Sequence, residues 1–232
     1  MLDKIIKDVE QALAPKSAEQ GTPKADRLLA TNSDTSTKPQ QPKKKKKEKK
    51  PKQPTPPAAD LVRSQFLQCD LRVGRVTEVS YHPQSELLYV LKVRYSDEEL
   101  RTICAGLRNY IPEEELKDRM VVTICNLKPR PLRGILSEGM VLAGSVKSDD
   151  GVKEEVVILA APAAAEDGSI VIAEGIDEER TVKDGKFVSG KTWDKIVPRL
   201  SVKDGTACYD SKPLRTAAGV ITCQLPDGAE IH

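Results

Sequence analysis

Hydrophobic and polar residues alternate in short runs from Phe66 onward, which is the pattern of half-buried β-strands. In the first run, LRVGRVTEV, the apolar residues Leu71, Val73, Val76 and Val79 are separated mainly by charged residues. Similar runs predict five strands followed by one further strand, over residues 71–79, 87–95, 100–107, 119–127, 139–146 and 154–160.

A short helix is predicted at residues 111–118, IPEEELKD, between the third and fourth strands. Pro112 suits the first turn of a helix, and three glutamates follow it at the positive N-terminal end. Short strands in close succession with one helix at this position predict a mainly β fold, a five-stranded Greek-key barrel of the OB-fold type. We expect this barrel to occupy residues 63–162.

The remaining residues, 163–232, predict an all-β extension that packs on the barrel. Short strand-like runs occur at residues 168–175, 185–190, 205–210 and 218–225. The segment KTWDKIVPRL lies among them and contains Trp193, the one tryptophan of the chain. A large aromatic ring in such a segment indicates packing in the core or between the two lobes.

The first 14 residues predict one amphipathic helix of about three turns, because their apolar residues recur at helical spacing. Such a helix is marginal in water by itself. Two interpretations follow, a frayed terminal helix or a segment that docks on another protein or on a second copy. The apolar residues concerned are Leu2, Ile5, Ile6, Val9 and Leu13.

Residues 15–62 predict a disordered linker, since Pro, Lys, Ser, Thr and Gln dominate and cannot form a packed core. Seven lysines occur among the eight residues 43–50. This Lys run is open to three interpretations: a solvated tether, an arm that contacts phosphates without sequence preference, or a nuclear localisation signal. Its lysines are Lys43, Lys44, Lys45, Lys46, Lys47, Lys49 and Lys50.

Charge is distributed unevenly along the 232 residues. The formal net charge is +2, but residues 1–60 carry +6 and residues 61–232 carry −4. A basic arm on a mildly acidic body is typical of proteins that bind nucleic acid or acidic membrane surfaces. The chain has no apolar run of membrane-spanning length, and residues 1–14 have no signal-peptide core, so we expect no membrane partner.

Five cysteines, Cys69, Cys104, Cys125, Cys208 and Cys223, form no C-x-x-C pair. Their odd number and wide spacing argue against a disulfide framework and against a zinc site. Cys104 and Cys125 lie in strand-like runs, where a free cysteine is usually a small core residue. We therefore expect a reducing, cytoplasmic location and neither a cofactor nor a metal.

The stretch TICNLKPRPLRGILSEGM, residues 123–140, places three cations between two apolar runs. Pro129 and Pro131 restrict the loop that carries Lys128, Arg130 and Arg133. A stiff loop presents its charges at fixed positions, which reduces the ordering cost of binding. This loop therefore predicts an anionic partner of fixed shape.

Several strings resemble the tRNA-binding domain of the endothelial-monocyte-activating-polypeptide family: DLRVGRVTEV, HPQSELLYVL, ICAGLRNYIP, NLKPRPLRGILSEGM and KTWDKIVPRL. The resemblance covers about 160 residues, from Cys69 to the C-terminus. It implies an OB-fold barrel that binds tRNA without strong sequence preference. Two acidic residues that the family has after the His82–Pro83 pair are absent here.

The resemblance implies roles for Asn126, Lys128, Arg133, Ser137 and Met140, which match the family string. A basic residue at Arg130 is compatible with the family. The cations would bind phosphate, and Arg can bridge two phosphate oxygens. The amide and the hydroxyl would bond phosphate or ribose, unless they bond within the loop instead. The methionine is expected to be a core residue.

Further cations alternate along the predicted strands. They extend the basic face or are simply solvated, and the pattern leaves both interpretations open. They are Arg72, Arg75, Lys92, Arg94 and Arg101. Eight aromatic residues in the whole chain are few for a protein that stacks single-stranded bases, so recognition of folded RNA by shape and backbone is favoured.

We therefore expect a non-catalytic protein that binds tRNA and delivers it to aminoacyl-tRNA synthetases in trans, with residues 1–14 docking on the synthetase. The alternative is a scaffold of a multi-synthetase complex or a cytokine-like interaction protein in which RNA binding is secondary. No catalytic motif is recognisable, which disfavours an enzyme. The resemblance further implies that the barrel and the extension are monomeric.

Overall fold

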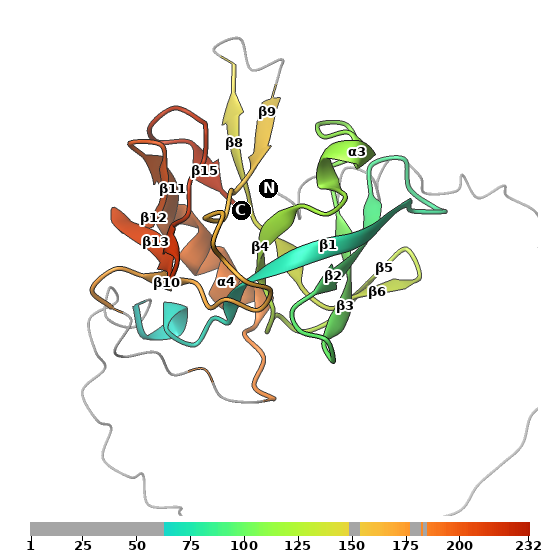
Figure 1. The fold of residues 1–232 in the computed structure, drawn as a ribbon, viewed down its shortest axis with the longest axis horizontal. Helices are drawn as coiled ribbons and strands as arrows, with labels where there is room; N and C mark the ends of the chain where they lie inside the picture. The colour runs from blue at the N-terminus through green and yellow to red at the C-terminus, as the bar shows by residue number, and fades with distance from the viewer. Residues whose placement is uncertain (1–62, 149–153, 177–181, 183–184) are drawn as a thin grey trace, which may run out of the picture. The chain divides into compact units, whose positions relative to one another are not determined.

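The computed structural model describes residues 63–148, 154–176, 182 and 185–232 (Figure 1). The predicted helix of residues 1–14 and the predicted linker of residues 15–62 lie outside the described residues. The docking role of the apolar residues in 1–14 and the RNA-binding role of the Lys run therefore stay predictions.

A five-stranded antiparallel sheet forms the barrel, in the strand order β3-β2-β1-β4-β7. Its strands are β1 (Leu71–Tyr81), β2 (Tyr89–Arg94), β3 (Leu100–Ala105), β4 (Met120–Ile124) and β7 (Met140–Val141). In β2 the alternation is direct, because Tyr89, Leu91 and Val93 are buried and the residues between them are partly exposed. The helix α3 (Glu113–Leu116) joins β3 to β4. The predicted mainly β fold with a five-stranded barrel is confirmed.

The longest strand, β1, connects two halves of this sheet. Residues 71–75 pair with β4, and residues 75–81 pair with β2, with a shift of register between Val76 and Glu78. A bulge of this kind bends a strand and increases its twist. The bend lets one strand take part in both sides of a nearly closed barrel.

The free edge of the first half of β1 is covered by the chain that follows the barrel. Val73 donates its N–H to the carbonyl of Ser169 and accepts from the N–H of Gly168, each at 2.8 Å. A Cβ atom on Gly168 would lie 2.5 Å from the carbonyl oxygen of Tyr95, and its φ is +84°. Glycine is therefore required where this segment crosses the barrel.

The second sheet has eight strands in the order β10-β13-β12-β11-β15-β8-β9, with β14 paired to β13. The predicted fifth barrel strand divides at Leu142 into β7 and β8, and β8 enters this second sheet. The strands are β8 (Ala143–Lys147), β9 (Glu154–Ile158), β10 (Ile172–Ala173), β11 (Leu200–Lys203), β12 (Thr206–Tyr209), β13 (Lys212–Thr216), β14 (Gly219–Val220) and β15 (Glu230–Ile231).

The extension also contains a helix, which the expectation of an all-β extension did not include. The helix α4 (Gly190–Ile196) is followed by a turn of 3-10 helix, η2 (Val197–Arg199). The Ser189 hydroxyl caps α4 by accepting from the N–H of Thr192 at 3.2 Å. Trp193 and Ile196 are buried, one helical turn apart on the same face. The prediction that the tryptophan lies in the core is confirmed.

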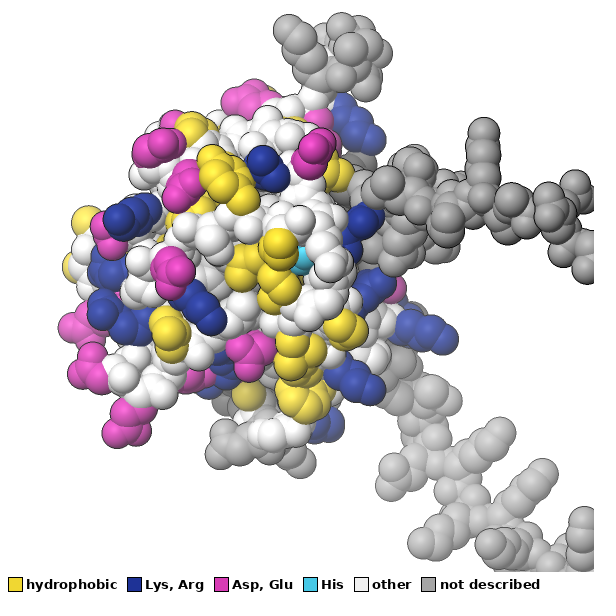
Figure 2. Space-filling view, turned by 90° about the vertical axis from the view of Figure 1, so that its right-hand side faces the viewer, with side chains coloured by type: hydrophobic (Ala, Val, Ile, Leu, Met, Phe, Trp, Pro, Cys, Tyr) yellow, Lys and Arg dark blue, Asp and Glu magenta, His cyan; other side chains and the backbone are white. Residues whose placement is uncertain are grey.

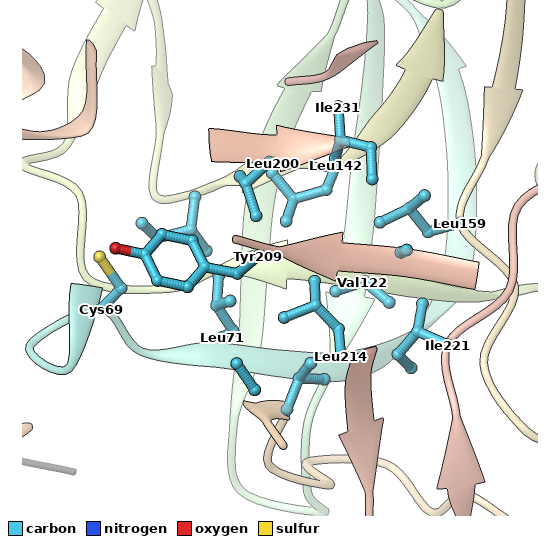
Figure 3. Packing of buried hydrophobic residues seen from close by; sticks show 14 of the residues in the cluster. Cys69, Leu71, Val122, Leu142, Leu159, Leu200, Tyr209, Leu214, Ile221 and Ile231 are labelled. Carbon is cyan, nitrogen blue, oxygen red and sulfur yellow. The ribbon is translucent and has the colours of Figure 1, made fainter. Parts of the chain in front are cut away.

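Two groups of buried residues stabilise the described part of the chain. One fills the barrel and includes Val76, Leu91 and Ile103. The other joins the outer side of the barrel to the extension (Figure 3). In it, Leu71 and Val122 from the barrel lie among residues of the second sheet such as Tyr209, Leu214 and Ile231. Strand β4 is buried on both faces, since Val121 belongs to the first group and Val122 to the second.

The five cysteines are buried as free thiols. Cys104 and Cys125 are core residues as predicted, with 4% and 3% of their surfaces exposed. Met140 is partly buried and packs against the core, as its predicted packing role requires. In residues 63–148, 154–176 and 185–232, no helix is long and apolar enough to cross a membrane.

Candidate nucleic-acid interface

The basic loop of residues 126–139 is a β-hairpin, although no strand was predicted there. Strand β5 (Arg130–Leu132) pairs with β6 (Ile135–Ser137), and Leu132 lies opposite Ile135. The two turn residues, Arg133 and Gly134, have φ values of +44° and +89°. Positive φ at both positions is the geometry of the hairpin turn whose twist matches that of the flanking strands. The loop is therefore rigid through strand pairing as well as through its prolines.

The end of the hairpin is fixed to β3 by Ser137. Its buried hydroxyl accepts from the N–H of Cys104 and donates to the carbonyl of Gly139, both at 3.0 Å. The next residue, Glu138, accepts from the N–H of Thr102 at 2.9 Å through its carboxylate. Ser137 thus positions the hairpin, and its predicted contact with RNA stays a prediction.

His82 connects the hairpin to the loop of residues 82–88, which joins β1 to β2. Its Nδ1 accepts from the N–H of Gln84 at 3.1 Å, so Nε2 carries the proton and donates to the carbonyl of Leu132 at 3.0 Å. Arg133 donates to the carbonyl of Gln84 at 3.4 Å. In OB-folds, the loop between the first two strands and the loop between the fourth and fifth flank the oligonucleotide-binding face. Here these two loops are bonded to each other.

Asn126 fixes the beginning of the same loop. Its Oδ1 accepts from the N–H of Asp70 at 2.8 Å, and its Nδ2 donates to the carbonyls of Gln68 at 2.8 Å and Lys186 at 3.3 Å. Its backbone carbonyl accepts from the N–H of Val188 at 2.7 Å. Both amide hydrogens are used within the protein. The side chain therefore joins three chain segments, and an RNA contact by Asn126 stays a prediction.

The extension reaches the site through residues 185–188, which lie beside the start of the loop. Leu127 forms a parallel bridge with Val188. Lys186 is exposed, and Phe187 has 54% of its surface exposed. Sequence reasoning missed this segment, because about 60 residues separate it from Asn126 and no local signal indicates the pairing.

The three hairpin cations differ in exposure. Lys128 and Arg130 are exposed, and Arg133 is partly buried. Within the described residues, Lys128 and Arg133 form no ion pair. Figure 2 faces the side of the molecule that carries the hairpin in Figure 1, and shows Lys and Arg side chains bordering a band of hydrophobic ones. This arrangement can attract and fix phosphate groups.

The further cations predicted on the strands are engaged inside the protein. Arg72 pairs with Asp70 at 2.8 Å and with Glu99 at 3.1 Å. Arg101 pairs with the same Glu99 and donates to the carbonyl of Cys125. These arginines therefore hold the end of β3 against β1 and β4, and the geometry favours a structural role over an RNA contact.

Arg75 and Arg94 lie opposite each other on β1 and β2, and one carboxylate serves both. Asp167 Oδ1 accepts from Arg75 Nε at 3.1 Å, and Oδ2 accepts from Arg94 Nε at 2.8 Å. Lys92 donates to the hydroxyl of Thr102 at 2.8 Å. The five strand cations thus lie on one sheet as expected, but each has a partner within the protein. An RNA contact by any of them stays a prediction.

Burial raises the pKa of two groups in the described core, the thiol of Cys69 and the hydroxyl of Tyr95. Burial, with a smaller effect of Asp70, raises the pKa of the Cys69 thiol to about 12. Burial also raises the pKa of the Tyr95 hydroxyl. In the part of the chain that the structure describes, no group of three His, Cys, Asp or Glu side chains is placed to hold a metal ion.

The sequence and the fold are similar to those of known proteins. Residues 71–170 match the family described as "Putative tRNA binding domain". The cytoplasmic methionine–tRNA ligase of Arabidopsis thaliana is 39% identical over 165 residues, which are 71% of this chain and 20% of the ligase. The aminoacyl tRNA synthase complex-interacting multifunctional protein 1 of Cricetulus griseus is 35% identical over 162 residues, which are 68% of this chain and 42% of that protein. The chain thus spans less than half the length of these relatives.

A solved structure matches over nearly its full length. The crystal structure of the C-terminal domain of Plasmodium vivax p43 has a TM-score of 0.65 and 32% identity, and the match covers 72% of this chain and 98% of that domain. The chain therefore belongs to the family of tRNA-binding domains that includes the C-terminal domain of p43, the endothelial-monocyte-activating-polypeptide-like family that its sequence resembles.

Proposed function

We propose that this protein is a non-catalytic cofactor that holds tRNA for aminoacyl-tRNA synthetases in trans, largely without sequence preference. One observation carries the proposal. The hairpin that presents Lys128, Arg130 and Arg133 is fastened at Ser137 and at His82. On the neighbouring strands, Arg72, Arg75 and Arg94 form ion pairs with carboxylates of the protein itself. We infer that the rigid hairpin makes the main cationic contacts with the ligand.

Physical chemistry explains why such a hairpin suits tRNA. Folded RNA presents regularly spaced phosphates, while its deep, narrow major groove hides the base edges from side chains. Cations at fixed positions match that backbone without reading sequence, and each neutralised phosphate releases counterions. The Lys run of residues 43–50 adds attraction over a longer range and raises the effective concentration of tRNA near the hairpin.

The proposed synthetase partner is supported by the relatives. Two kinds of protein, tRNA ligases and a protein named for its interaction with the synthase complex, contain a segment similar to this chain. In the ligases the similar segment is 20% to 30% of the enzyme. We infer that this chain binds tRNA for synthetases in trans in the cytoplasm, and that the apolar residues of the segment 1–14 dock on the synthetase.

The test is tRNA binding against salt concentration for the full chain and two variants. In the hairpin variant, Lys128→Gln and Arg130→Gln remove charge, and Arg133→Asn does so while tolerating positive φ. In the arm variant, the seven lysines of residues 43–50 become Gln. Each lost phosphate contact lowers the slope of log K against log salt by about 1. We expect both variants to lose affinity, and the hairpin variant to lose about 2 to 3 in slope.

A matched control removes three exposed cations from the extension, by Lys195→Gln, Lys203→Gln and Lys212→Gln. This control lowers the net charge by the same amount, so it should keep most of the tRNA affinity. Equal losses in the hairpin variant and the control would show a general charge effect and refute the hairpin site. An unchanged hairpin variant would favour the alternative, in which the protein is a scaffold or a cytokine-like interaction protein.

A further inference from the structure

An exposed tyrosine and an arginine are stacked at the end of β1, next to the hairpin. The ring of Tyr81 has 55% of its residue surface exposed, and the guanidinium carbon of Arg108 lies 4.4 Å from the centre of that ring. The ring also packs at 5.6 Å against the buried Tyr89. Tyr81 is therefore held in place from the barrel side while it remains accessible to solvent.

Arg108 is itself fixed by the loop that the hairpin holds. Its Nη1 donates to the carbonyl of Ser85 at 3.3 Å, and its backbone N–H donates to the carbonyl of Leu87 at 3.4 Å. Arg133 of the hairpin turn donates to the adjacent carbonyl of Gln84. One short loop therefore positions an aromatic ring and two guanidinium groups on one rim of the barrel.

We propose that Tyr81 and Arg108 form a stacking site for one unpaired nucleotide of the bound RNA. This inference rests on the proposed function and extends it from the phosphate backbone to a base. Unpaired bases stack on aromatic rings and on guanidinium planes, and every base has such a face. Because the ring and the guanidinium are already held, little side-chain freedom is lost on binding. The nearby cation of Arg133 can bind the phosphate of the same nucleotide.

The proposed stacking site modifies the expectation, drawn from the low aromatic content, that the protein recognises RNA by shape and backbone alone. Few aromatic rings disfavour a channel for a long single strand, but one exposed ring beside the phosphate-binding hairpin accommodates a single base. Tyr110 does not offer the same chemistry. Its hydroxyl donates to Glu154 Oε2 at 3.1 Å, and a carboxylate at that position repels RNA. Tyr110 is thus a matched control, since it is an exposed tyrosine on the barrel and no cation of the described residues stacks on its ring.

The experiment uses the full chain and two RNA probes, a short single strand that contains 2-aminopurine and a blunt-ended duplex. Stacking of the fluorescent base on Tyr81 quenches its emission. We expect Tyr81→Leu to abolish the quenching and to weaken single-strand binding at least about fivefold, the lower limit for one stacked base. Duplex binding should change by less than about twofold in the same variant, since it depends on phosphate contacts.

Three further variants separate stacking from other effects. Tyr81→Phe keeps the ring and should behave as the unchanged protein, and Tyr110→Leu should do the same. Arg108→Lys keeps the charge but loses the planar group, so it should reduce quenching. Near-UV circular dichroism reports whether each variant keeps its tertiary fold.

The proposal is overturned if Tyr81→Leu keeps the quenching, or if it weakens duplex and single strand equally. It is also overturned if the unchanged protein binds tRNA and duplex but does not quench the probe. That last result would leave the proposed function intact. Absence of tRNA binding by the unchanged protein would instead refute the proposed function itself.

Discussion

The carboxylate of Asp167 offers the sharpest test of which arginines are structural. It accepts from Arg75 and Arg94, which face each other across β1 and β2. Only 16% of the Asp167 side chain is exposed, while 36% and 41% of the two arginine side chains are. Asp167→Asn removes the charge between two cations and places an amide donor against one guanidinium donor.

The expected loss of stability follows from these contacts. Two charge-assisted hydrogen bonds to a mostly buried carboxylate are each worth about 1 kcal/mol once the exposure of the arginines is allowed for. The variant should therefore lose about 2 kcal/mol of unfolding free energy. With a urea slope of about 2 kcal/mol per molar, the midpoint of unfolding should fall by about 1 M. Fluorescence of the buried Trp193 reports the transition.

Asp167→Asn should keep its tRNA affinity within about twofold. The variant leaves the proposed contacts between the hairpin and tRNA unchanged, and the loss of one negative charge is a minor long-range effect. Glu166→Gln is the matched control. It removes one exposed carboxylate from the same segment and should leave the midpoint unchanged. An unchanged midpoint of urea unfolding in Asp167→Asn would refute the structural role of the ion pairs from Asp167 to Arg75 and Arg94. A large loss of tRNA binding after Arg75→Gln with Arg94→Gln, in protein that stays folded, would instead establish these arginines as RNA contacts.

Three other outcomes are expected. Asn126→Ala loses three side-chain hydrogen bonds, so its unfolding free energy, measured in urea, should fall by about 2 to 3 kcal/mol. A fall below about 0.5 kcal/mol, which is typical of a neutral surface change, would contradict this. Gly168→Ala should lower the melting temperature more than Gly185→Ala, because both have positive φ but only Gly168 lies against Tyr95; equal losses would contradict the close approach. Burial, more than Asp70, raises the pKa of Cys69 from 9.0 to about 12. The unfolded thiol therefore ionises first, and between about pH 8 and 10 the unfolding free energy should fall by about 1.4 kcal/mol more in the unchanged protein than in Cys69→Ala; parallel falls would refute the assignment.

Local patterns were sufficient to predict the barrel. Alternation of apolar and polar residues in β1 and β2 reflects burial of one face of each strand, and this depends only on neighbouring residues. The glutamates after Pro112 mark the helix α3 for an equally local reason. The three cations of the basic loop and its stiffness were also evident from the sequence.

The hairpin itself was not predicted, although its cations were. Two prolines and a charged residue at the turn obscured the strand pattern. Arg133 adopts a φ of +44°, a conformation usually associated with Gly or Asn, and no composition rule assigns it to arginine. The pairing of β5 with β6 and the bond from His82 to Leu132 hold it there, and the latter joins residues 50 positions apart.

Thus the sequence by itself determined the class of fold, the family resemblance, the uneven charge and the identity of the hairpin cations. Only the tertiary structure decided which cations form ion pairs within the protein. Arg75 and Arg94 meet Asp167 across 92 and 73 positions, and Asn126 meets Lys186 across 60. Whether a cation forms an ion pair depends on distances of a few ångströms between segments that are far apart in the chain. The pattern of neighbouring residues in the sequence does not determine those distances.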